Sequence, residues 1–542
     1  MTDPPLRSGH GGQPIRSGLV GAAAKITAGN VASRVTGLVR VVAVAGALGT
    51  TFLGNTYQTA NLVSNILFEL LAAGLLSSVL VPPFVGLIDA GRRDEAERVA
   101  GALLGVVLVA LGAITLGGLL GRTWIMRALT VAVPDPTVRA EEVRLGAFLL
   151  VLFLPQVLFY AVGAVATALL HGDRRFTAPA FAPVANNVVV IATMAVFWVM
   201  RGGGTRGAGG LALRGSERLV LAVGTTAGVA AMTLVALVAA WRGGLRLRPR
   251  WDPDHAGLRE LARAGAWAGG YLALNQVLVA TTLVLANRVE GGVVAYQIAF
   301  TVFLLPFAVL AHPTVTAVYP GLAADAVARR WRAFADGLAT SSSALVFLLA
   351  PAAALTVALA RPGLTLLRLG ELDAAGTSLA ARVLAAYALG LLGYAGFQLL
   401  TRASYASGDT RTPTVVNLGV AAGGSALMLL LYAAATGGDR VMVLGLAHSA
   451  AMVAGSAALL LLVRRRVGER CFSSASLARG LACGLAAALA ARLVADRLPG
   501  TGRLAALAAV ALGTAAGLSV YLAGQWWLGA PELRRLRSEV AS

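Results

Sequence analysis

The sequence predicts an all-α polytopic membrane protein with about fourteen transmembrane helices. Hydrophobic residues make up 57% of the 542 residues and charged residues only 13%, whereas soluble domains carry about 25% charged residues. The hydrophobic residues also form stretches that reach the roughly 20 residues a helix needs to cross a bilayer. The gaps between these stretches hold at most about 25 residues, which leaves no room for a soluble catalytic domain.

Fourteen apolar segments follow one another along the chain. Several contain Gly or Pro and are longer than a straight crossing requires, so we expect kinked or tilted helices among them. The expected spans are 18–47, 53–88, 99–120, 143–171, 178–200, 218–241, 264–286, 291–320, 337–360, 379–405, 413–436, 440–463, 476–495 and 503–529.

The arginines predict the orientation of these spans. We number the gaps between consecutive spans from the N-terminus. Of the basic residues, 26 lie at the two tails and the even-numbered gaps, against 15 at the odd-numbered gaps. The gap 201–218 opposes this bias with four Arg, but the positive-inside rule still places both termini in the cytoplasm. The net charge of +20 is therefore a topology signal and not a nucleic-acid surface. Residues 1–17 have no apolar core of a signal peptide and predict a disordered cytoplasmic tail.

The first span carries two arginines in its middle, Arg34 and Arg40. A charge near the bilayer centre costs at least about 2.5 kcal/mol, so it persists only beside a partner or a wet cavity. No acid lies within a helical turn of either arginine. On a helix the two are about 9 Å apart in rise and about 120° apart in azimuth, so both can line one broad cavity for an anion such as a phosphate. The alternative is that they snorkel to an interface or bond free carbonyls at a kink near Gly37.

The second span begins with unusually many polar residues. Asn61 and Asn65 are i,i+4 and share a helix face with each other, and Asn55 precedes them. This pattern fits a cavity wall, or an interhelical hydrogen-bond seam. Glu69 is the only acid within the expected spans. We expect it to pair with Arg34 or Arg40 when the cavity is empty, or alternatively to take a proton.

A weak internal repeat relates two segments about 235 residues apart. Asn186 and Asn187 follow Pro183 at the start of the fifth span, and Asn417 follows Pro413 at the start of the eleventh. The residues before them also match, since Gly172-Asp173-Arg174-Arg175 resembles Gly408-Asp409-Thr410-Arg411. Such repeats are common in transporters, whose substrate sites lie between the two halves.

Catalytic and cofactor motifs are missing from the sequence. It has no GxxxxGK[ST] phosphate loop, no HExxH, no Cys/His zinc spacing and no GxSxG. Its two cysteines, Cys471 and Cys483, lack a metal-ligand spacing and are interpreted as small hydrophobic residues. We therefore expect neither an enzyme nor a bound cofactor. An ion gradient, the membrane potential or downhill movement would drive a transport reaction.

Four stretches of the chain carry a family resemblance. They are Ser33-Arg34-Val35-x-Gly37-x-x-Arg40, Asn65 to Pro82, Leu154-Pro155-Gln156-x-x-Phe159-Tyr160 with the following Arg175 to Asn187, and Arg402 to Pro413. Over these stretches, and along the whole chain, the sequence resembles the MurJ (MviN) lipid II flippases of the multidrug/oligosaccharidyl-lipid/polysaccharide (MOP) exporter superfamily. The stretch Asn65 to Leu71 is similar to the actinobacterial branch of that family.

The resemblance implies two pseudo-symmetric six-helix lobes and two added C-terminal helices that shape a lipid-tail groove. The lobes would rock between inward-open and outward-open states around a cationic cavity that holds a diphosphate-sugar head group. The implied divisions are a tail (1–17), an N-terminal lobe (18–241), a basic cytoplasmic linker (242–263), a C-terminal lobe (264–463), the last two helices (464–530) and a second tail (531–542).

The expected site residues follow from the cavity argument and the resemblance together. Arg34 and Arg40 fall on the family's two cavity arginines of the first helix. The expected substrate-binding residues are Arg34, Arg40, Asn55, Asn61, Asn65 and Glu69. The expected structural or gating residues are Gly37, Asn186, Asn187, Arg402, Asp409, Arg411 and Pro413.

The sequence also departs from the family pattern. Two further cavity arginines of the family fall on Phe68 and near Thr301, and an aspartate falls on Asn55. The expected function is the flipping of lipid II, or a related polyprenyl-diphosphate glycan, across a bacterial plasma membrane. Two alternatives stay open: a paralogue that moves another polyprenyl-linked glycan, and a non-transporting scaffold in envelope synthesis. Membrane lipids and, for the scaffold, cell-wall synthesis proteins are the other expected partners, and nucleic acid is not.

Overall fold

The computed structural model describes residues 13–69, 81–202, 207–252, 256–498, 500 and 502–534. All regular secondary structure in these residues is helical, which confirms the predicted fold class. Twelve helical stretches are long and apolar enough to cross a bilayer, and the bent pair α14–α15 makes thirteen within the described part of the chain. The protein is thus a multi-pass membrane protein.

The N-terminal lobe is built from the helices before residue 243. These are α1 (Gln13–Leu48), α2 (Phe52–Phe68), α4 (Val81–Asp89), α5 (Arg93–Leu129), α6 (Pro136–Phe153), α7 (Gln156–Gly172), α8 (Thr177–Arg201) and α9 (Gly215–Arg242), with a short 3-10 turn, η2 (Ala208–Gly210). Their buried apolar side chains form cores that belong to this lobe, centred on Tyr57 and Phe153 and on Phe84 and Leu169.

The C-terminal lobe repeats this plan with the next helices. These are α10 (Ala256–Ala286), α11 (Gly292–Pro306), η3 (Phe307–Ala311), α12 (His312–Val327), α13 (Trp331–Leu366), α14 (Ala374–Ala388), α15 (Leu391–Ala406), α16 (Arg411–Ala434) and α17 (Asp439–Val467). One continuous core runs through the lobe and contains Phe303, Phe334, Tyr387 and Phe397. Because each lobe has a core of its own, each can move as a unit.

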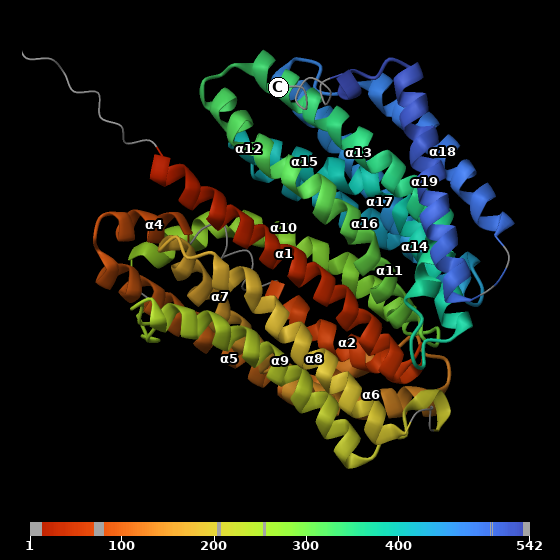
Figure 1. Ribbon diagram of the computed structural model, residues 1–542. Coiled ribbons are helices and arrows are strands. Elements are labelled where there is room, and N and C mark those ends of the chain that lie inside the picture. Colours follow the sequence, from red (N-terminus) through yellow and green to blue (C-terminus); the bar gives the residue numbers. More distant parts are fainter. Residues whose placement is uncertain are drawn as a thin grey trace, which may run out of the picture.

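The last two helices, α18 (Ser474–Arg497) and α19 (Arg503–Trp527), pack on each other and on α13. Small residues allow this close approach, since a Cβ on Gly480 would lie 2.5 Å from Val346 and one on Gly517 would lie 2.5 Å from Leu355. Packing of small residues is the usual way that membrane helices associate. In Figure 1 the pair lies on the outer side of the C-terminal lobe, away from the N-terminal lobe.

The two lobes converge at one end, which we call the closed end: residues 46–55 of the N-terminal lobe and residues 287–293 and 369–373 of the C-terminal lobe (Figure 1). Here the backbones nearly touch. The Glu371 amide donates to the Gly46 carbonyl at 2.8 Å. Gly370 has φ +54° and a Cβ there would lie 2.3 Å from the Gly46 carbonyl oxygen, so only glycine fits. The interlobe hydrogen bonds of the described residues gather at this end.

Helix caps lie at the same end. Thr51 caps α2 by accepting from the Gly54 amide at 3.3 Å, and Asp373 caps α14 by accepting from the Gly376 amide at 2.7 Å. Such caps satisfy amides that have no partner within the helix. The Thr50 hydroxyl donates to the Asp373 carboxylate at 3.4 Å, so one of these caps also joins the lobes.

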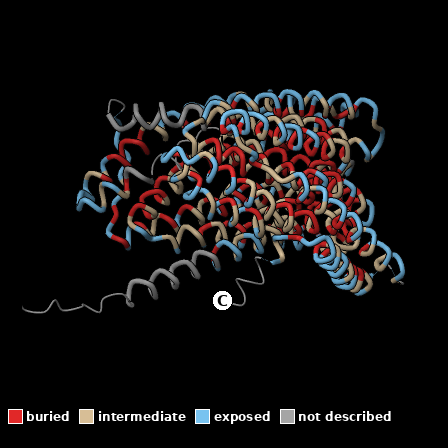
Figure 2. The backbone as a smooth tube through the Cα atoms, turned by 90° about the horizontal axis from the view of Figure 1, so that it is seen from above, coloured by how far each residue is buried: buried red, intermediate tan, exposed pale blue. Residues whose placement is uncertain are grey.

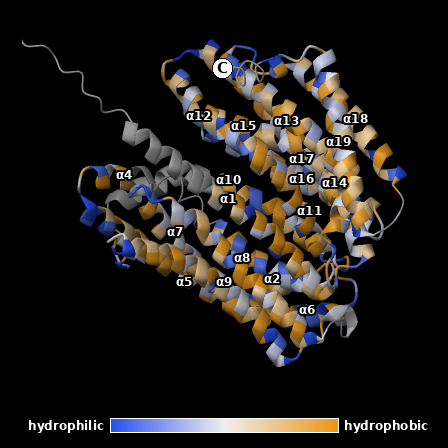
Figure 3. Cartoon of the chain, viewed as in Figure 1, coloured by the Kyte–Doolittle hydropathy of each residue, from blue (hydrophilic) through white to orange (hydrophobic). Residues whose placement is uncertain are grey.

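Hydropathy and burial follow the expected pattern of a membrane protein. Hydrophobic residues run along the helix lengths while hydrophilic residues collect at helix ends and loops (Figure 3). Viewed from above, buried residues lie mostly inside the molecule and exposed residues on its outside (Figure 2). Many of the exposed ones are large hydrophobics such as Leu120 and Trp527, at 76% and 81% exposed. A lipid-facing surface explains them.

Several predicted element boundaries need correction. The expected span 143–171 begins earlier, because helix continues from Pro136 to Gly172 with a break at Leu154 and Pro155. The expected span 379–405 is two helices bent by 47°. The first helix begins at Gln13, so the predicted tail 1–17 is shorter, and residues 1–12 lie outside the described ones. Residues 70–80 of the predicted span 53–88 and residues 535–542 of the predicted second tail also lie outside them.

Candidate functional site: a cavity between the lobes

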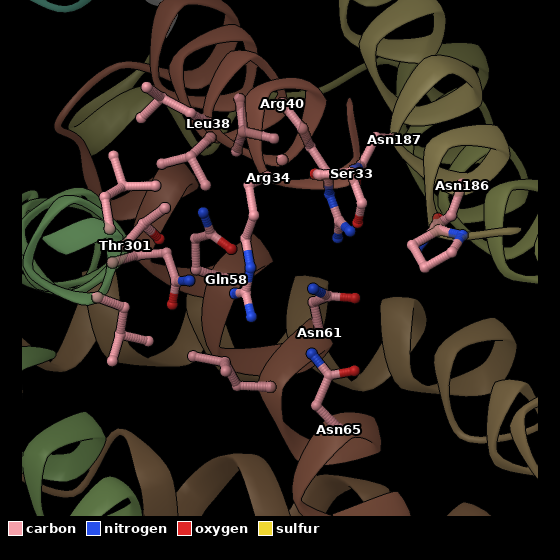
Figure 4. Close-up of a pocket in the computed structure, with 18 residues that line it drawn as sticks. Ser33, Arg34, Leu38, Arg40, Gln58, Asn61, Asn65, Asn186, Asn187 and Thr301 are labelled. Atoms are coloured by element: carbon pink, nitrogen blue, oxygen red, sulfur yellow. The ribbon is translucent and has the colours of Figure 1, made fainter. Parts of the chain in front are cut away.

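A cavity of about 360 Å³ lies between the lobes, where α1, α2 and α8 of one lobe face α11 of the other (Figure 4). Its size lies in the usual range for small-molecule sites, about 300–1,000 Å³. Its wall carries two arginines and a set of amide side chains and is otherwise mostly apolar. The lining residues are Ser33, Arg34, Gly37, Leu38, Arg40, Val41, Val44, Gln58, Asn61, Leu62, Asn65, Pro183, Asn186, Asn187, Gln297, Thr301, Leu304 and Leu305.

Arg34 and Arg40 extend from α1 into the same space (Figure 4). Arg34 is exposed to the cavity and Arg40 is half-buried. Neither forms an ion pair or a hydrogen bond with a described residue, so the N–H groups of both guanidinium groups are available to bind a ligand. Their charges are uncompensated inside a membrane-spanning segment, which favours an anion that binds there.

Asn187 holds the arginine-bearing stretch of α1 against α8. Its amide donates to the Ser33 carbonyl at 3.3 Å and to the Thr36 hydroxyl at 3.0 Å. Gly37 lies opposite, where a Cβ would be 3.7 Å from the Asn187 amide nitrogen. Asn186 is buried at 7% exposure, and its side-chain oxygen has no partner among the described residues. These residues fix where the two arginines stand.

The facing wall comes from α2 and α11. Gln58, Asn61 and Asn65 lie one above another on the cavity side of α2 (Figure 4). Asn65 also accepts a hydrogen bond from the Tyr160 hydroxyl at 3.2 Å. Gln297 lines the opposite lobe, and the sequence interpretation missed it. The signal for it was an amide inside the otherwise apolar start of the eighth span.

Two expected substrate-binding residues stand elsewhere. Asn55 is fully buried at the closed end, where its amide donates to the Val289 carbonyl at 2.9 Å and its oxygen accepts from the Val293 amide at 3.0 Å. It therefore joins the lobes and does not line the cavity. Glu69 is half-buried beyond the cavity wall and pairs with neither Arg34 nor Arg40. The expected ion pair in the empty cavity is wrong for this structure.

The two positions where the family pattern has arginines differ from each other. Thr301 lines the cavity on α11, so an arginine there would add a third positive charge to it. Phe68 instead stacks on Tyr160, with ring centroids 4.8 Å apart, and packs into the core of the N-terminal lobe. Among the described lining residues, the charge comes from α1 alone and the other polar groups are neutral.

The internal repeat is visible in contacts as well as in sequence. Asn417 of α16 donates to the Tyr271 carbonyl at 2.8 Å and to the Asn275 side chain at 3.1 Å, which ties α16 to α10. Asn187 ties α8 to α1 in the same way. The two asparagines thus join corresponding helix pairs of the two lobes. Asn275 is a partner that the sequence interpretation missed.

The turn before α16 is fixed by Asp409. Its carboxylate accepts from the Thr412 amide at 2.9 Å and from the Arg466 guanidinium at 2.5 Å. Burial raises the pKa of Asp409, but these hydrogen bonds and the charge of Arg466 outweigh it and leave the pKa below its ordinary value. Asp173 occupies the matching turn of the other lobe, where it pairs with Arg93 and Arg175.

The remaining expected gating residues flank this turn. Pro413 is buried in the first turn of α16, where a missing amide hydrogen costs nothing. Arg402 is half-buried and Arg411 is exposed, and neither guanidinium group bonds to a residue that the structure describes. None of these residues lines the cavity.

Sequence interpretation also missed an acid. Glu142 of α6 is fully buried within the stretch Pro136–Gly172, so the expectation that Glu69 is the only acid in a span is wrong. Hydropathy placed the start of the span directly after Glu142, and the helix here begins two turns earlier.

The lipid II flippase MurJ family model matches residues 44–529. The chain belongs to this family. Among curated relatives, the probable lipid II flippase MurJ of Rhizobium meliloti is 28% identical over 407 residues, which cover 73% of this chain and 72% of that protein. The lipid II flippase MurJ of Burkholderia cenocepacia is 26% identical over 407 residues, covering 72% and 73%.

Solved structures of MurJ and of a wider superfamily share the fold. A lipid II flippase MurJ in an inward closed conformation matches 92% of this chain and 97% of its own, with a TM-score of 0.75 and 18% identity. A multidrug resistance MATE family transporter of the MOP superfamily, in an inward-facing conformation, matches 80% of this chain and 94% of its own with a TM-score of 0.65 and 15% identity.

Proposed function

We propose that this member of the MurJ family flips lipid II, or a closely related polyprenyl-diphosphate glycan, by alternating access. Arg34 and Arg40 would bind the diphosphate, and the amides around them would bind sugar hydroxyls. The observation that carries the proposal is a pair of guanidinium groups that have no partner among the described residues and line a cavity between the lobes, which hydrogen bonds join at the closed end. The relatives named above, a lipid II flippase MurJ and a probable lipid II flippase MurJ, support this cargo.

The proposal also assigns the sides of the membrane. The arginine bias puts both termini in the cytoplasm, so the closed end faces outward and the cavity is loaded from the inside. A head group bound by Arg34 and Arg40 would then leave after the closed end opens. Its lipid tail would stay in the bilayer throughout.

Depletion and rescue test the proposal. A bacterium whose own lipid II flippase is depleted should grow when it expresses this chain. Arg34→Ala and Arg40→Ala should each reduce rescue at least tenfold while the protein still reaches the membrane, because a charge-assisted hydrogen bond to a buried group contributes about 1.5–3 kcal/mol. Arg144→Ala is the matched control, since Arg144 is exposed and pairs with Glu141 outside the cavity. Equal rescue by all three variants would contradict the cavity assignment and favour a scaffold role.

One observation favours a second candidate, a paralogue for another polyprenyl-linked glycan. Thr301 leaves the cavity wall of α11 uncharged where the family pattern has an arginine. A paralogue would fail to rescue the depleted strain although it is inserted in the membrane. Its deletion from the native host would alter a different surface polymer and leave peptidoglycan synthesis intact.

A further inference from the structure

Glu142 is a polar residue in the middle of an apolar helix face. It lies on the face of α6 that carries Val138, Leu145 and Leu149, all of them buried. Its own exposed fraction is 0%. Its neighbours Glu141 and Arg144 form an exposed ion pair and therefore point to a different side of the helix. The cavity between the lobes does not include Glu142, and the proposed transport site makes no use of it.

The hydrogen bonds of Glu142 fit a protonated carboxyl group better than a carboxylate. One carboxyl oxygen lies 3.1 Å from the Thr56 hydroxyl oxygen, and that hydroxyl lies 2.8 Å from the Phe52 carbonyl. A threonine hydroxyl has one hydrogen to donate, and in helices it commonly goes to the carbonyl four residues earlier. When that hydrogen goes to Phe52, the Thr56 oxygen is left as an acceptor, and a protonated Glu142 supplies the hydrogen of the bond between them.

The second carboxyl oxygen of Glu142 is buried and has no hydrogen-bond partner. A carboxylate there would carry its charge with at most one donor, which strongly disfavours ionisation. No described cation forms an ion pair with it. Besides Glu142, α6 and the helices packed against it carry these charged or titratable groups: Arg139, Glu141 and Arg144 of α6, Tyr57 of α2, Arg93, Asp94, Glu95, Glu97, Arg98, Arg122 and Arg127 of α5, Tyr160 and His171 of α7, and Glu217, Arg218 and Arg242 of α9.

None of these groups bonds to Glu142, and several have partners of their own. Tyr57 shares a hydrogen bond with Thr225. Arg127 stacks on Trp124 with its guanidinium carbon 5.2 Å from the ring centroid. Glu217 accepts from the Arg214 amide at 2.9 Å. The site is therefore built around a neutral acid.

We propose that Glu142 is a proton-binding site whose occupancy is linked to the closed end: the proton is bound while that end is shut and is released when it opens.

The link runs through the first half of α2. Thr56, the partner of Glu142, stands next to Asn55, which bonds Val289 and Val293 of the other lobe. One turn further on, the Thr59 hydroxyl accepts a hydrogen bond from the Asn287 amide at 3.1 Å. Opening the closed end breaks these contacts and admits water beside α2. Hydration lowers the cost of a charge on Glu142, so the open state favours the carboxylate.

The direction of the pH effect follows from proton counting. The closed state binds one more proton than the open state, so acid favours closure and alkali favours opening. For one proton the ratio of closed to open molecules changes by at most about tenfold per pH unit. The inference rests on the alternating access of the proposed function but is independent of its cargo.

A distance measurement between the lobes tests the linkage. Val131, 61% exposed, and the exposed Thr436 lie in loops at the end of the molecule where the lobes meet, one in each lobe. Both native cysteines, Cys471 and Cys483, are free and buried and would be replaced by Ala. Spin labels at Val131→Cys and Thr436→Cys then report opening of the full chain in nanodiscs by pulsed electron resonance, from acidic to alkaline buffer.

The expected result is a closed population that falls as the pH rises. Glu142→Gln, which imitates the protonated acid, should hold the closed distance at every pH. Glu141→Gln, a change at the exposed neighbour, should follow the wild type. A wild type without pH dependence would overturn the proposal, as would a Glu142→Gln variant that keeps the wild-type dependence.

Infrared spectroscopy covers the case in which Glu142→Gln does not fold. The wild type at neutral pH should show the carbonyl stretch of a protonated carboxyl, and Thr56→Val should shift that band because it removes the hydroxyl that Glu142 contacts. A spectrum without such a band, or a band that Thr56→Val leaves in place, would also overturn the proposal. If the pH-linked opening is present and rescue of the flippase-depleted strain fails, the cargo assignment is wrong and the proton site stands.

Discussion

Arg34 and Arg40 are kept in the membrane by polar surroundings, because no acid of the described part of the chain pairs with them. The amides of Gln58, Asn61 and Asn187 provide a polar wall, and the cavity admits water to the two guanidinium groups. Water and neutral amides lower the free-energy cost of placing the two charges in the membrane, and they do not neutralise them. A site of this kind binds an anion more strongly than a site in which each arginine already has an acid partner, because no existing ion pair must be broken.

At the same scale, Asp409 predicts a pH dependence of stability. The pKa of Asp409 is below its ordinary value in the folded protein, so its contribution is present above the unfolded pKa of about 3.8 and is lost as the pH falls through the folded pKa. Asp409→Asn should reduce stability at neutral pH by about 1 kcal/mol, the scale of a half-exposed ion pair with one charged hydrogen bond. The variant should also lose less stability than the wild type does when the pH is lowered, because it lacks the carboxylate that is protonated.

Thermal unfolding in detergent at neutral pH and at pH values below about 4 measures both effects. Asp439→Asn is the control, because Asp439 pairs with Arg382 at 2.6 Å on an exposed surface and caps no turn. Equal stability of the Asp409→Asn and wild-type proteins at neutral pH would mean that the turn before α16 does not depend on this carboxylate.

At the scale of the element, the first half of α2 is where the lobes are joined and where the cavity begins. Its side chains alternate between the two tasks: Asn55 and Thr59 bond the other lobe, while Gln58 and Asn61 face the cavity. One helix can serve both because residues three or four apart share a face and residues between them point elsewhere. A movement of α2 would therefore change the cavity wall and the closed end together.

Asn55→Ala should shift the molecule toward opening of the closed end. The change removes two interlobe hydrogen bonds at 2.9 and 3.0 Å. The loss of about 1–3 kcal/mol would lower the ratio of closed to open molecules roughly 5- to 150-fold. The label pair at Val131 and Thr436 measures that ratio directly. Asn61→Ala is the matched control on the same helix, since Asn61 lines the cavity and makes no bond to the other lobe.

The elements were largely predictable from sequence, and the reason is physical. A bilayer requires about 20 apolar residues per helix, so composition along the chain is nearly sufficient to find the spans. Breaks within a span leave the composition unchanged. The 47° bend between α14 and α15 occurs at Leu389 and Gly390 without a proline, and tertiary packing decides it. The hydropathy of the sequence therefore could not predict the position of this bend.

The candidate site was predictable in part. Arg34 and Arg40 were found because an unpaired charge in an apolar segment is costly wherever the fold puts it. Asn55 and Asn61 are the same residue type six positions apart, and only the structure separates an interlobe contact from a cavity wall. Glu142 was placed in a gap because a charged residue lowers the hydropathy of its own window.

At the scale of the whole molecule, the lobes have largely separate cores. They meet through polar contacts at the closed end and through the packing of α11 on α1 and α2, where Ala45 of α1 joins the core of the C-terminal lobe. Such an interface can break and reform without disturbing the inside of either lobe. The arrangement predicts two rigid bodies that rock about their contact. It also predicts that locking the contact blocks transport, whatever the cargo is.

Thr50 and Asp373 provide the lock, because their side-chain oxygens are 3.4 Å apart across the closed end. With Cys471 and Cys483 replaced by Ala, the pair Thr50→Cys and Asp373→Cys joined by a short thiol cross-linker should abolish rescue of the flippase-depleted strain. A cleavable linker should restore growth when it is reduced. The same linker between Arg382→Cys and Asp439→Cys, a pair within the C-terminal lobe, should leave growth intact. Growth with the interlobe link in place would show that this closed end does not open during function, and alternating access through it would have to be abandoned.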